Sequence, residues 1–176
     1  MEGDLVNEKL EPIRDQHHSP FSSLPFGRGN VYGNGCGVVA LYHTLLFRGE
    51  GHPFEEVLAG CREKKLWWRK GAWGMAPWDM KRFLKLSGIR GRLFFGPWKT
   101  LEKKCREGDV VILATFNEKW WKYGVHNYAC HREKDGWRVY NNGAETFFPT
   151  LREAAHLRPR LAAIRVAGRD KIIEKQ

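Results

Sequence analysis

Cys36 stands where a glycine-rich turn meets an apolar segment, and this position suits a thiol nucleophile. The stretch NVYGNGCGVVALYHTLLFRG, residues 30–49, changes from turn-forming to apolar residues at the cysteine. A helix N-terminus supplies positive potential and free N–H groups, which favour the thiolate, the nucleophilic form of cysteine. The nearby glycines, Gly33, Gly35 and Gly37, allow the backbone to turn tightly and to approach a substrate. Cys36 is therefore the candidate nucleophile, and Gly35 is a candidate substrate-binding residue.

A thiol nucleophile needs a base, commonly a histidine, and a group that orients this base. The chain contains seven histidines, and two of them are informative by their position. His43 lies inside the apolar segment and is expected to be a core residue. His126 follows the residues KYG at the mouth of a predicted strand, from where a side chain reaches a cleft, so it is the candidate base. The other histidines are His17, His18, His52, His131 and His156.

The dipeptide Asp135-Gly136 lies between two short apolar segments and predicts a hairpin turn. A two-residue turn at this point would place Cys130 opposite Asn141. Because side chains alternate along a strand, Asn141 would share the face of His126, whereas Asn142 would point away. Asn141 would still lie about 13 Å along its strand from the residue opposite His126. A bulge, a longer loop or strong twist must close this gap if Asn141 is to orient the histidine.

Two segments combine basic and aromatic residues, CREKKLWWRKGAWG at 61–74 and NEKWWKYG at 117–124. The second segment leads into His126, so Trp120 and Trp121 are expected to line the rim of the cleft and bind substrate. Gly74 closes a glycine-flanked loop that is expected on the opposite wall. Two other interpretations stay open: a solvated basic face with packed tryptophans, or a surface that stacks bases and neutralises phosphates.

The elements that must position these residues follow from apolar periodicity and from turn signals. Helices are expected first and short strands afterwards, which predicts an α+β domain with an antiparallel sheet. The helices are expected at 36–47, from Pro53 to residue 61, from Pro77 to Gly88 and at 100–108, with a helical turn at 150–157. The strands are expected at 92–95, 109–116, 125–132, 136–141 and 160–166.

The 176 residues suffice for one domain with a substantial core. We expect residues 1–29 to form an extended arm, 30–168 the folded domain and 169–176 a frayed tail. The formal net charge of +10 attracts polyanions or acidic substrates and does not bear on the fold.

Targeting signals are missing from the sequence as given. The first residues lack the basic start and apolar run of a signal peptide, and no stretch of about 18 apolar residues occurs. The four cysteines are widely spaced, and their even number allows two disulfides, but a cytosolic chain is expected to keep its thiols reduced. The sequence therefore predicts a cytoplasmic protein without membrane insertion.

The ordered segments resemble a known family. NGCGVVALYHTLL, GMAPWDMKRFLKLSGI, GDVVILATF and VHNYACHREKDGWRVYNN are similar to segments of papain-like cysteine peptidases of the bacteriocin-leader, or double-glycine, processing type. The resemblance covers roughly residues 30–145. It implies a papain-like cysteine proteinase fold, in which a helix that starts with the nucleophile packs on an antiparallel sheet.

The resemblance also implies roles for individual residues. Cys36 would be the nucleophile, His126 the general base and later the general acid, and Asn141 the residue that orients the histidine. The family places a Gln six residues before the cysteine to stabilise the oxyanion, and this chain has Asn30 there. Asn34 is the alternative donor. The family's usual members are fused to transporters and no such part is present in this sequence, so a specific substrate does not carry over.

These observations predict an enzyme that acts on a peptide or amide bond through a cysteine thioester, by hydrolysis, acyl transfer or deamidation. Its partner would be a peptide or protein substrate, with acidic peptides favoured by the charge. No cofactor is implied, and no metal, since His126, Cys130 and His131 lack the paired spacing of zinc ligands. The alternatives are a catalytically silent binding domain with a basic aromatic cleft and, third and less favoured, a basic nucleic-acid-binding protein.

Overall fold

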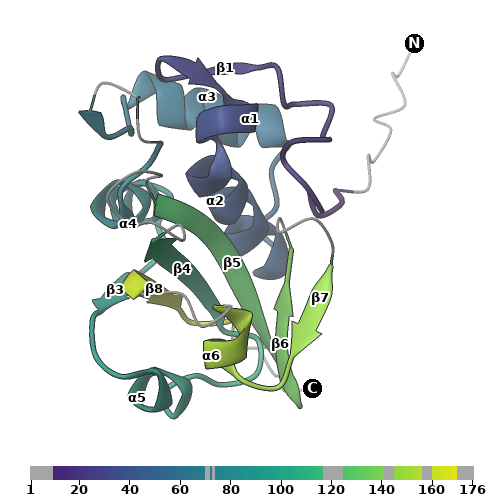
Figure 1. Ribbon diagram of the computed structural model, residues 1–176, viewed down its shortest axis with the longest axis vertical. Helices are drawn as coiled ribbons and strands as arrows, with labels where there is room; N and C mark the ends of the chain where they lie inside the picture. The colour runs from purple at the N-terminus through teal and green to yellow at the C-terminus, as the bar shows by residue number, and fades with distance from the viewer. Residues whose placement is uncertain are drawn as a thin grey trace, which may run out of the picture.

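The computed structural model describes residues 10–69, 72, 74–116, 125–140, 145–155 and 160–169. A group of helices from the first half of the chain packs on a β-sheet formed mainly by the second half (Figure 1). This arrangement is the α+β fold that the sequence predicts.

The central helix α2, Cys36–Phe47, has the predicted bounds. Every residue from Cys36 to Leu45 is buried, because apolar residues cover most of the helix circumference. A short helix α1, Val31–Asn34, directly precedes it. The chain leaves α2 at Arg48 and turns at Gly49, whose φ of +68° lies in the left-handed region that favours glycine.

Helices α3, Phe54–Glu63, and α4, Pro77–Leu86, complete the helical layer. Each begins at a proline, as Pro53 precedes α3 and Pro77 opens α4, where the missing N–H group is not needed. Both helices are amphipathic and bury one face. This confirms the helices that the sequence predicts in these two segments.

The sheet has six antiparallel strands in the order β3-β8-β4-β5-β6-β7. Its longest pairing joins β4 to β5, along which Phe116 lies opposite Val125 and Val110 opposite His131. A separate two-stranded hairpin of β1 and β2 precedes the helices. The bounds are β1 Pro25–Phe26, β2 Gly29–Asn30, β3 Gly91–Phe94, β4 Val110–Phe116, β5 Val125–Glu133, β6 Gly136–Val139, β7 Thr146–Phe148 and β8 Arg160–Val166.

The two faces of the sheet contact different parts of the chain. On β4, Ile112 belongs to the core beneath α2, α3 and α4, whereas Val111 and Leu113 face a second core. The short helices α5, Trp98–Glu102, and α6, Leu151–Ala154, cover this second face. Alternation along β5 follows the same rule, so its odd-numbered residues face α2 and its even-numbered residues face the second core.

The helix predicted at 100–108 is wrong in its position and length. Helix α5 starts directly after Pro97 and ends at Glu102, before the run of Lys103 and Lys104. Gly108 does not end a helix. It has a φ of +85° in the loop before β4, where its N–H donates to the carbonyl of Arg132.

The predicted register of the β5–β6 hairpin is also wrong. The turn residues are Lys134 and Asp135, and Gly136 already pairs with Glu133. Cys130 therefore lies opposite Val139 and not opposite Asn141. The shift is two residues along β6, so it leaves the assignment of residues to faces unchanged.

Residues 10–30 lie along the helical layer. The backbone N–H of Ile13 donates to Nε2 of His43 at 3.0 Å, and the Tyr42 hydroxyl donates to the carbonyl of Glu11 at 2.7 Å. His43 is fully buried in the core, as predicted, and this burial lowers its pKa to about 3. The imidazole is therefore neutral, with Nε2 as a hydrogen-bond acceptor.

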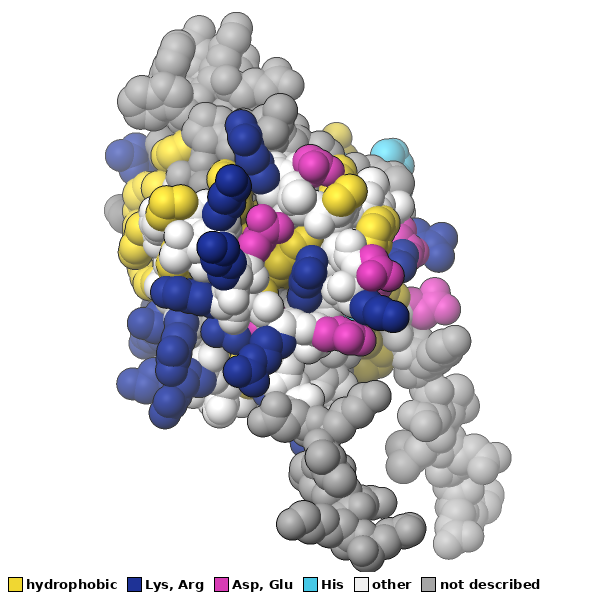
Figure 2. Space-filling model, turned by 90° about the horizontal axis from the view of Figure 1, so that it is seen from below, with side chains coloured by type: hydrophobic (Ala, Val, Ile, Leu, Met, Phe, Trp, Pro, Cys, Tyr) yellow, Lys and Arg dark blue, Asp and Glu magenta, His cyan; other side chains and the backbone are white. Residues whose placement is uncertain are grey.

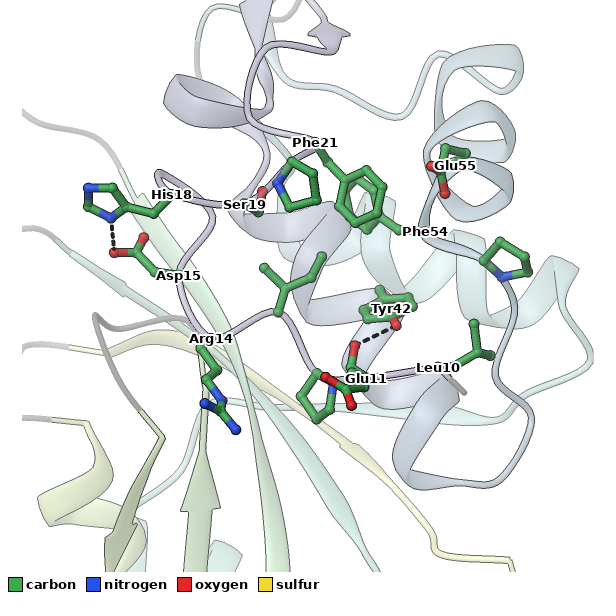
Figure 3. Close-up of a pocket in the computed structure, with 14 residues that line it drawn as sticks. Leu10, Glu11, Arg14, Asp15, His18, Ser19, Phe21, Tyr42, Phe54 and Glu55 are labelled. Atoms are coloured by element: carbon green, nitrogen blue, oxygen red, sulfur yellow. Dashed lines mark hydrogen bonds and ion pairs between the residues drawn. The ribbon is translucent and has the colours of Figure 1, made fainter. Parts of the chain in front are cut away.

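A hollow of about 720 Å³ lies between this N-terminal segment and the helices α2 and α3 (Figure 3). Phe21 stacks on Phe54 at its wall, with 4.7 Å between ring centroids, and Tyr42 lies edge-on to Phe54. Asp15 binds His18 at the rim, at 2.9 Å. The hollow borders the middle of α2, and Cys36 is not among its lining residues.

All four cysteines are free thiols in the structure. Within the described ranges, no helix has the length and apolar character needed to cross a bilayer.

Candidate active site

Cys36 is the first residue of α2 and lies against the start of β5. Helix and strand run side by side in the same direction, since Phe47 at the end of α2 stacks on His131 with ring centroids 4.9 Å apart. The Cys36 thiol is 3.9 Å from the carbonyl oxygen of Val125 and 3.7 Å from Nδ2 of Asn127. The structure thus brings Cys36 to the two residues that flank His126, which are about 90 positions further along the chain.

His126 is half-buried and pairs with Thr115 of β4. Its ring centroid is 5.4 Å from that of Tyr128, at an interplanar angle of 30°. By alternation His126 shares the face of Tyr128, whereas Asn127 faces Cys36. A base must reach the sulfur directly or through one water. The assignment of His126 as the base therefore stays a prediction, and it requires the His126 side chain to reach around the end of β5 toward Cys36.

Asn127 is a site residue that the sequence analysis missed. It is fully buried, and its Nδ2 donates to the carbonyl of Met75 at 3.0 Å as well as approaching the Cys36 sulfur. Its Oδ1 is buried and has no hydrogen-bond partner among the described residues. The signal in the sequence was an amide side chain inside an apolar strand, next to the candidate base.

Gly74 and Met75 lie against the start of α2 and against Asn127. The backbone of Met75 receives the Asn127 amide, and a Cβ atom added to Gly37 would be 2.6 Å from the Met75 side chain. Gly74 has a φ of +67°, and a Cβ atom there would be 2.9 Å from the carbonyl oxygen of Asn34. Only glycine fits at position 74 without strain. Gly74 therefore lies beside the α1–α2 turn, and its role in substrate binding stays a prediction.

The tight turn before Cys36 explains Gly35. A Cβ atom at this position would be 2.6 Å from the carbonyl oxygen of Val31, which accepts the Gly35 N–H at 2.9 Å. Gly35 is thus required for the close approach of α1 and α2. Its contact with substrate stays a prediction.

The two candidate oxyanion donors have different surroundings. Asn30 is the N-cap of α1, and its Oδ1 accepts from the N–H of Gly33 at 3.1 Å. Asn34 packs its amide against Gly29, where an added Cβ would be 2.8 Å from Nδ2. The cap uses the oxygen of Asn30, so the role of its amide N–H groups stays a prediction. Asn141, Trp120 and Trp121 lie outside the described residues.

The thiols differ in what surrounds them. Burial raises the pKa of Cys36 above its ordinary value, while N–H groups of Asn127, Gly37 and Cys36 itself act to lower it. Burial alone raises the pKa of Cys61 to about 12 and that of Cys130 well above its ordinary range. Burial also raises the pKa of Cys105 to about 11. Among the four cysteines, Cys36 is therefore the one whose thiolate form would be stabilised by nearby N–H donors.

No group of three or more His, Cys, Asp or Glu side chains that could hold a metal ion occurs within the described ranges.

No known family profile matches the sequence, and no curated protein sequence matches it either. Solved structures do match the fold. The peptidase domain of Streptococcus ComA, a bifunctional ABC transporter involved in a quorum-sensing pathway, aligns with a TM-score of 0.55 at 13% identity, over 76% of this chain and 91% of that domain.

A second similar structure is a double-glycine-motif protease from an AMS/PCAT transporter, solved in complex with the leader peptide. It aligns with a TM-score of 0.53 at 13% identity, over 75% of this chain and 84% of its own. At this identity the likeness concerns the fold. The chain has the papain-like α+β fold of double-glycine peptidase domains.

Proposed function

We propose that the protein is a cysteine-peptidase-like enzyme that attacks a peptide or amide bond with Cys36. The observation that carries this proposal is the place of the thiol at the N-terminus of the central helix. There it meets N–H donors and the first residues of the strand that bears His126. The shared fold with peptidase domains supports the same chemistry.

In the proposed reaction, His126 takes the proton from the Cys36 thiol, and the thiolate attacks the substrate carbonyl carbon. The C–N bond then breaks, the amine leaves with the proton from His126, and an acyl thioester remains on Cys36. Water attacks the thioester, releases the acid and restores the thiol. An amine in place of water would give acyl transfer, and a side-chain amide as substrate would give deamidation.

Several groups would stabilise the charged species. The N–H groups of the α2 N-terminus and Nδ2 of Asn127 would stabilise the thiolate. The amide of Asn30 or of Asn34 would donate to the oxyanion, together with the backbone N–H of Cys36. Asn141 would orient His126, and Trp120 and Trp121 would contact the substrate. A peptide is the favoured substrate class, and the net charge of +10 favours an acidic one.

A catalytically silent peptide-binding domain is the second candidate, because Cys36 is only 7% exposed and burial raises the pKa of its thiol. The two candidates differ in covalent chemistry. A peptide aldehyde should form a hemithioacetal with Cys36 in the enzyme, and should bind a silent domain without a covalent bond.

The experiment is iodoacetamide labelling at mildly acidic pH with peptide mapping, followed by the same mapping after addition of a peptide aldehyde. We expect labelling of Cys36 before the other three cysteines, protection by the aldehyde and slower labelling in His126→Ala. Cys61→Ala serves as the matched control and should label like the native protein. Equal labelling of all four thiols, or labelling of Cys36 that is independent of His126, would refute the assigned site.

A further inference from the structure

A second hollow, at the opposite end of β4 from Cys36, is lined by ten residues, of which six are Lys or Arg and two are acidic. It has a volume of about 580 Å³. The hollow borders Asp109, next to the start of β4, whereas Cys36 contacts the strand that pairs with the end of β4. A strand of seven residues spans roughly 20 Å, so the two places are separate. We call it the basic hollow; its charged lining residues are Arg92, Lys103, Lys104, Arg106, Glu107, Asp109, Arg165 and Arg169.

The frame of the basic hollow is fixed by one buried carboxylate. Asp109 is 3% exposed and accepts from the backbone N–H of Arg106 at 3.0 Å and of Gly168 at 2.9 Å. It also binds the Arg165 guanidinium, at 2.7 Å from Nη2 and 2.8 Å from Nε. A Cβ added to Gly168 would be 2.8 Å from the carbonyl oxygen of Gly108, so the two loops touch through backbone. The loops that carry the cations are therefore held together.

The charges of the basic hollow are not balanced within the described residues. Asp109 is used by Arg165, and Arg169 lies 3.9 Å from Glu50 outside the hollow. The side chains of Arg92, Lys103, Lys104 and Arg106 form no ion pair in the part of the chain that the structure describes. Glu107 is the one further acid in the lining.

Arg92 also lies directly opposite Arg165 in the β3–β8 pairing. Like charges at directly opposed positions of a sheet are destabilising. The protein therefore keeps several cations around one concave surface at an energetic cost, and an anion in the hollow would remove that cost. Figure 2 shows that Lys and Arg side chains gather along one side of the face seen from below, where acidic side chains are fewer.

We propose that the basic hollow binds a compact anion that carries several phosphate groups. Arginine guanidinium groups bind phosphate oxygens in pairs, and lysine ammonium groups add point charges, which suits closely spaced phosphates. The frame favours a compact ligand over a long flexible one, because the cations line one concave surface whose loops are held together by Asp109. This site is independent of the proposed reaction at Cys36.

The test is calorimetric titration of the full chain with inorganic tripolyphosphate in low salt. We expect the double variant Lys103→Gln/Lys104→Gln to bind at least tenfold more weakly, and Arg106→Gln to weaken binding in the same direction. Lys81→Gln/Lys85→Gln on α4 removes the same charge from another exposed surface and should change binding less than twofold. All replaced side chains are exposed, and thermal unfolding checks that each variant folds.

Two further measurements identify the source of the phosphate. Binding to tripolyphosphate alone supports a soluble ligand, and additional binding to phosphatidate vesicles, lost in the same variants, supports a lipid headgroup. Equal weakening in both double variants would show an effect of net charge only and overturn the proposal. Binding to a single-stranded oligonucleotide without binding to tripolyphosphate would overturn it as well. The rate of Cys36 labelling in every variant should equal that of the native protein. This holds whether or not Cys36 proves to be a catalytic nucleophile, because the two sites are separate.

Discussion

Around α2 the protein buries neutral polar groups that are incompletely hydrogen-bonded, whereas at Asp109 it buries a carboxylate whose partners are present. Nδ1 of His43 and Oδ1 of Asn127 have no hydrogen-bond partner among the described residues. The carboxylate of Asp109, whose side chain is 5% exposed, accepts from two backbone N–H groups and from Arg165. Asn127 lies near one end of the β4–β5 pair, and Asp109 directly precedes β4 at the other end.

This difference separates a structural region from a candidate reactive one. A buried donor or acceptor without a partner costs about 1–3 kcal/mol, so natural proteins keep few of them. Beside Cys36, Nδ2 of Asn127 approaches the thiol and donates to the carbonyl of Met75, and this orientation leaves Oδ1 of Asn127 without a partner among the described residues. At the other end the Asp109 carboxylate has its partners, and it holds together the loops that carry the cations of the basic hollow.

The largest expected effect is at the Asp109 end. Asp109→Ala should lower the free energy of unfolding by about 3–5 kcal/mol, because it leaves Arg165 and two backbone N–H groups without their acceptor. Urea unfolding at pH 7 measures this loss. Asp135→Ala, at an exposed turn, is the control and should stay within about 0.5 kcal/mol of the native protein. Similar losses in both variants would contradict the contrast between the regions.

The next effect is a pH dependence at His43. Its pKa is lowered by burial from 6.5 to about 3, so the unfolded chain binds a proton that the folded protein does not. Stability should therefore fall as the pH drops from 6.5 toward 3, by about 1.4 kcal/mol per pH unit in the middle of this window.

Unfolding in urea at pH 7, 5 and 4 measures this slope. In His43→Leu the pH dependence of the unfolding free energy should decrease by the contribution of one proton. In His52→Gln it should stay as in the native protein, since the His52 side chain is 60% exposed. An unchanged slope in His43→Leu would show that another group binds the proton.

A smaller effect is expected at the thiol itself. Asn127→Leu removes the donor that lies 3.7 Å from the Cys36 sulfur and keeps the side-chain volume. Since hydrogen bonds to charged groups contribute about 1.5–3 kcal/mol at good geometry and less at this distance, alkylation of Cys36 at pH 7 should slow about tenfold. The measurement is the alkylation rate against pH.

Thr44→Val is the matched control, because its buried hydroxyl donates to the carbonyl of Ala40 on the same helix and does not contact the thiol. Its alkylation profile should equal that of the native protein. Loss of rate in both variants would assign the effect to general loosening of α2.

The smallest effect is expected from the residue that orients His126. Asn141→Ala should shift the pH profile of Cys36 alkylation, and Asn142→Ala should not. The observed register keeps odd-numbered residues of β6 on the face of His126, as Val139 lies opposite Cys130. If only Asn142→Ala shifts the profile, Asn142 has the orienting role.

The misplaced turn shows why local signals were insufficient. The dipeptide Asp135-Gly136 predicts a turn, but a Cβ on Gly136 would be 2.4 Å from the carbonyl oxygen of Phe148. Glycine stands there because β7 passes close to it, and the turn lies one residue earlier. Gly108 was misassigned for a similar reason, since it lies against Gly168 rather than at a helix end. A glycine in the sequence can indicate that another segment packs closely against the backbone, but it does not identify that segment.

The sequence by itself determined the elements whose apolar pattern is complete within one segment. Helix α2 has its predicted bounds because nearly all its residues are apolar, and Pro53 and Pro77 mark the starts of α3 and α4. The strand that carries His126 and the α+β class also follow from local pattern. Only the tertiary structure decided which groups meet the Cys36 sulfur, because Asn127 lies 91 residues away and its face depends on strand register. Contacts of this kind arise from packing between segments, which no local pattern encodes.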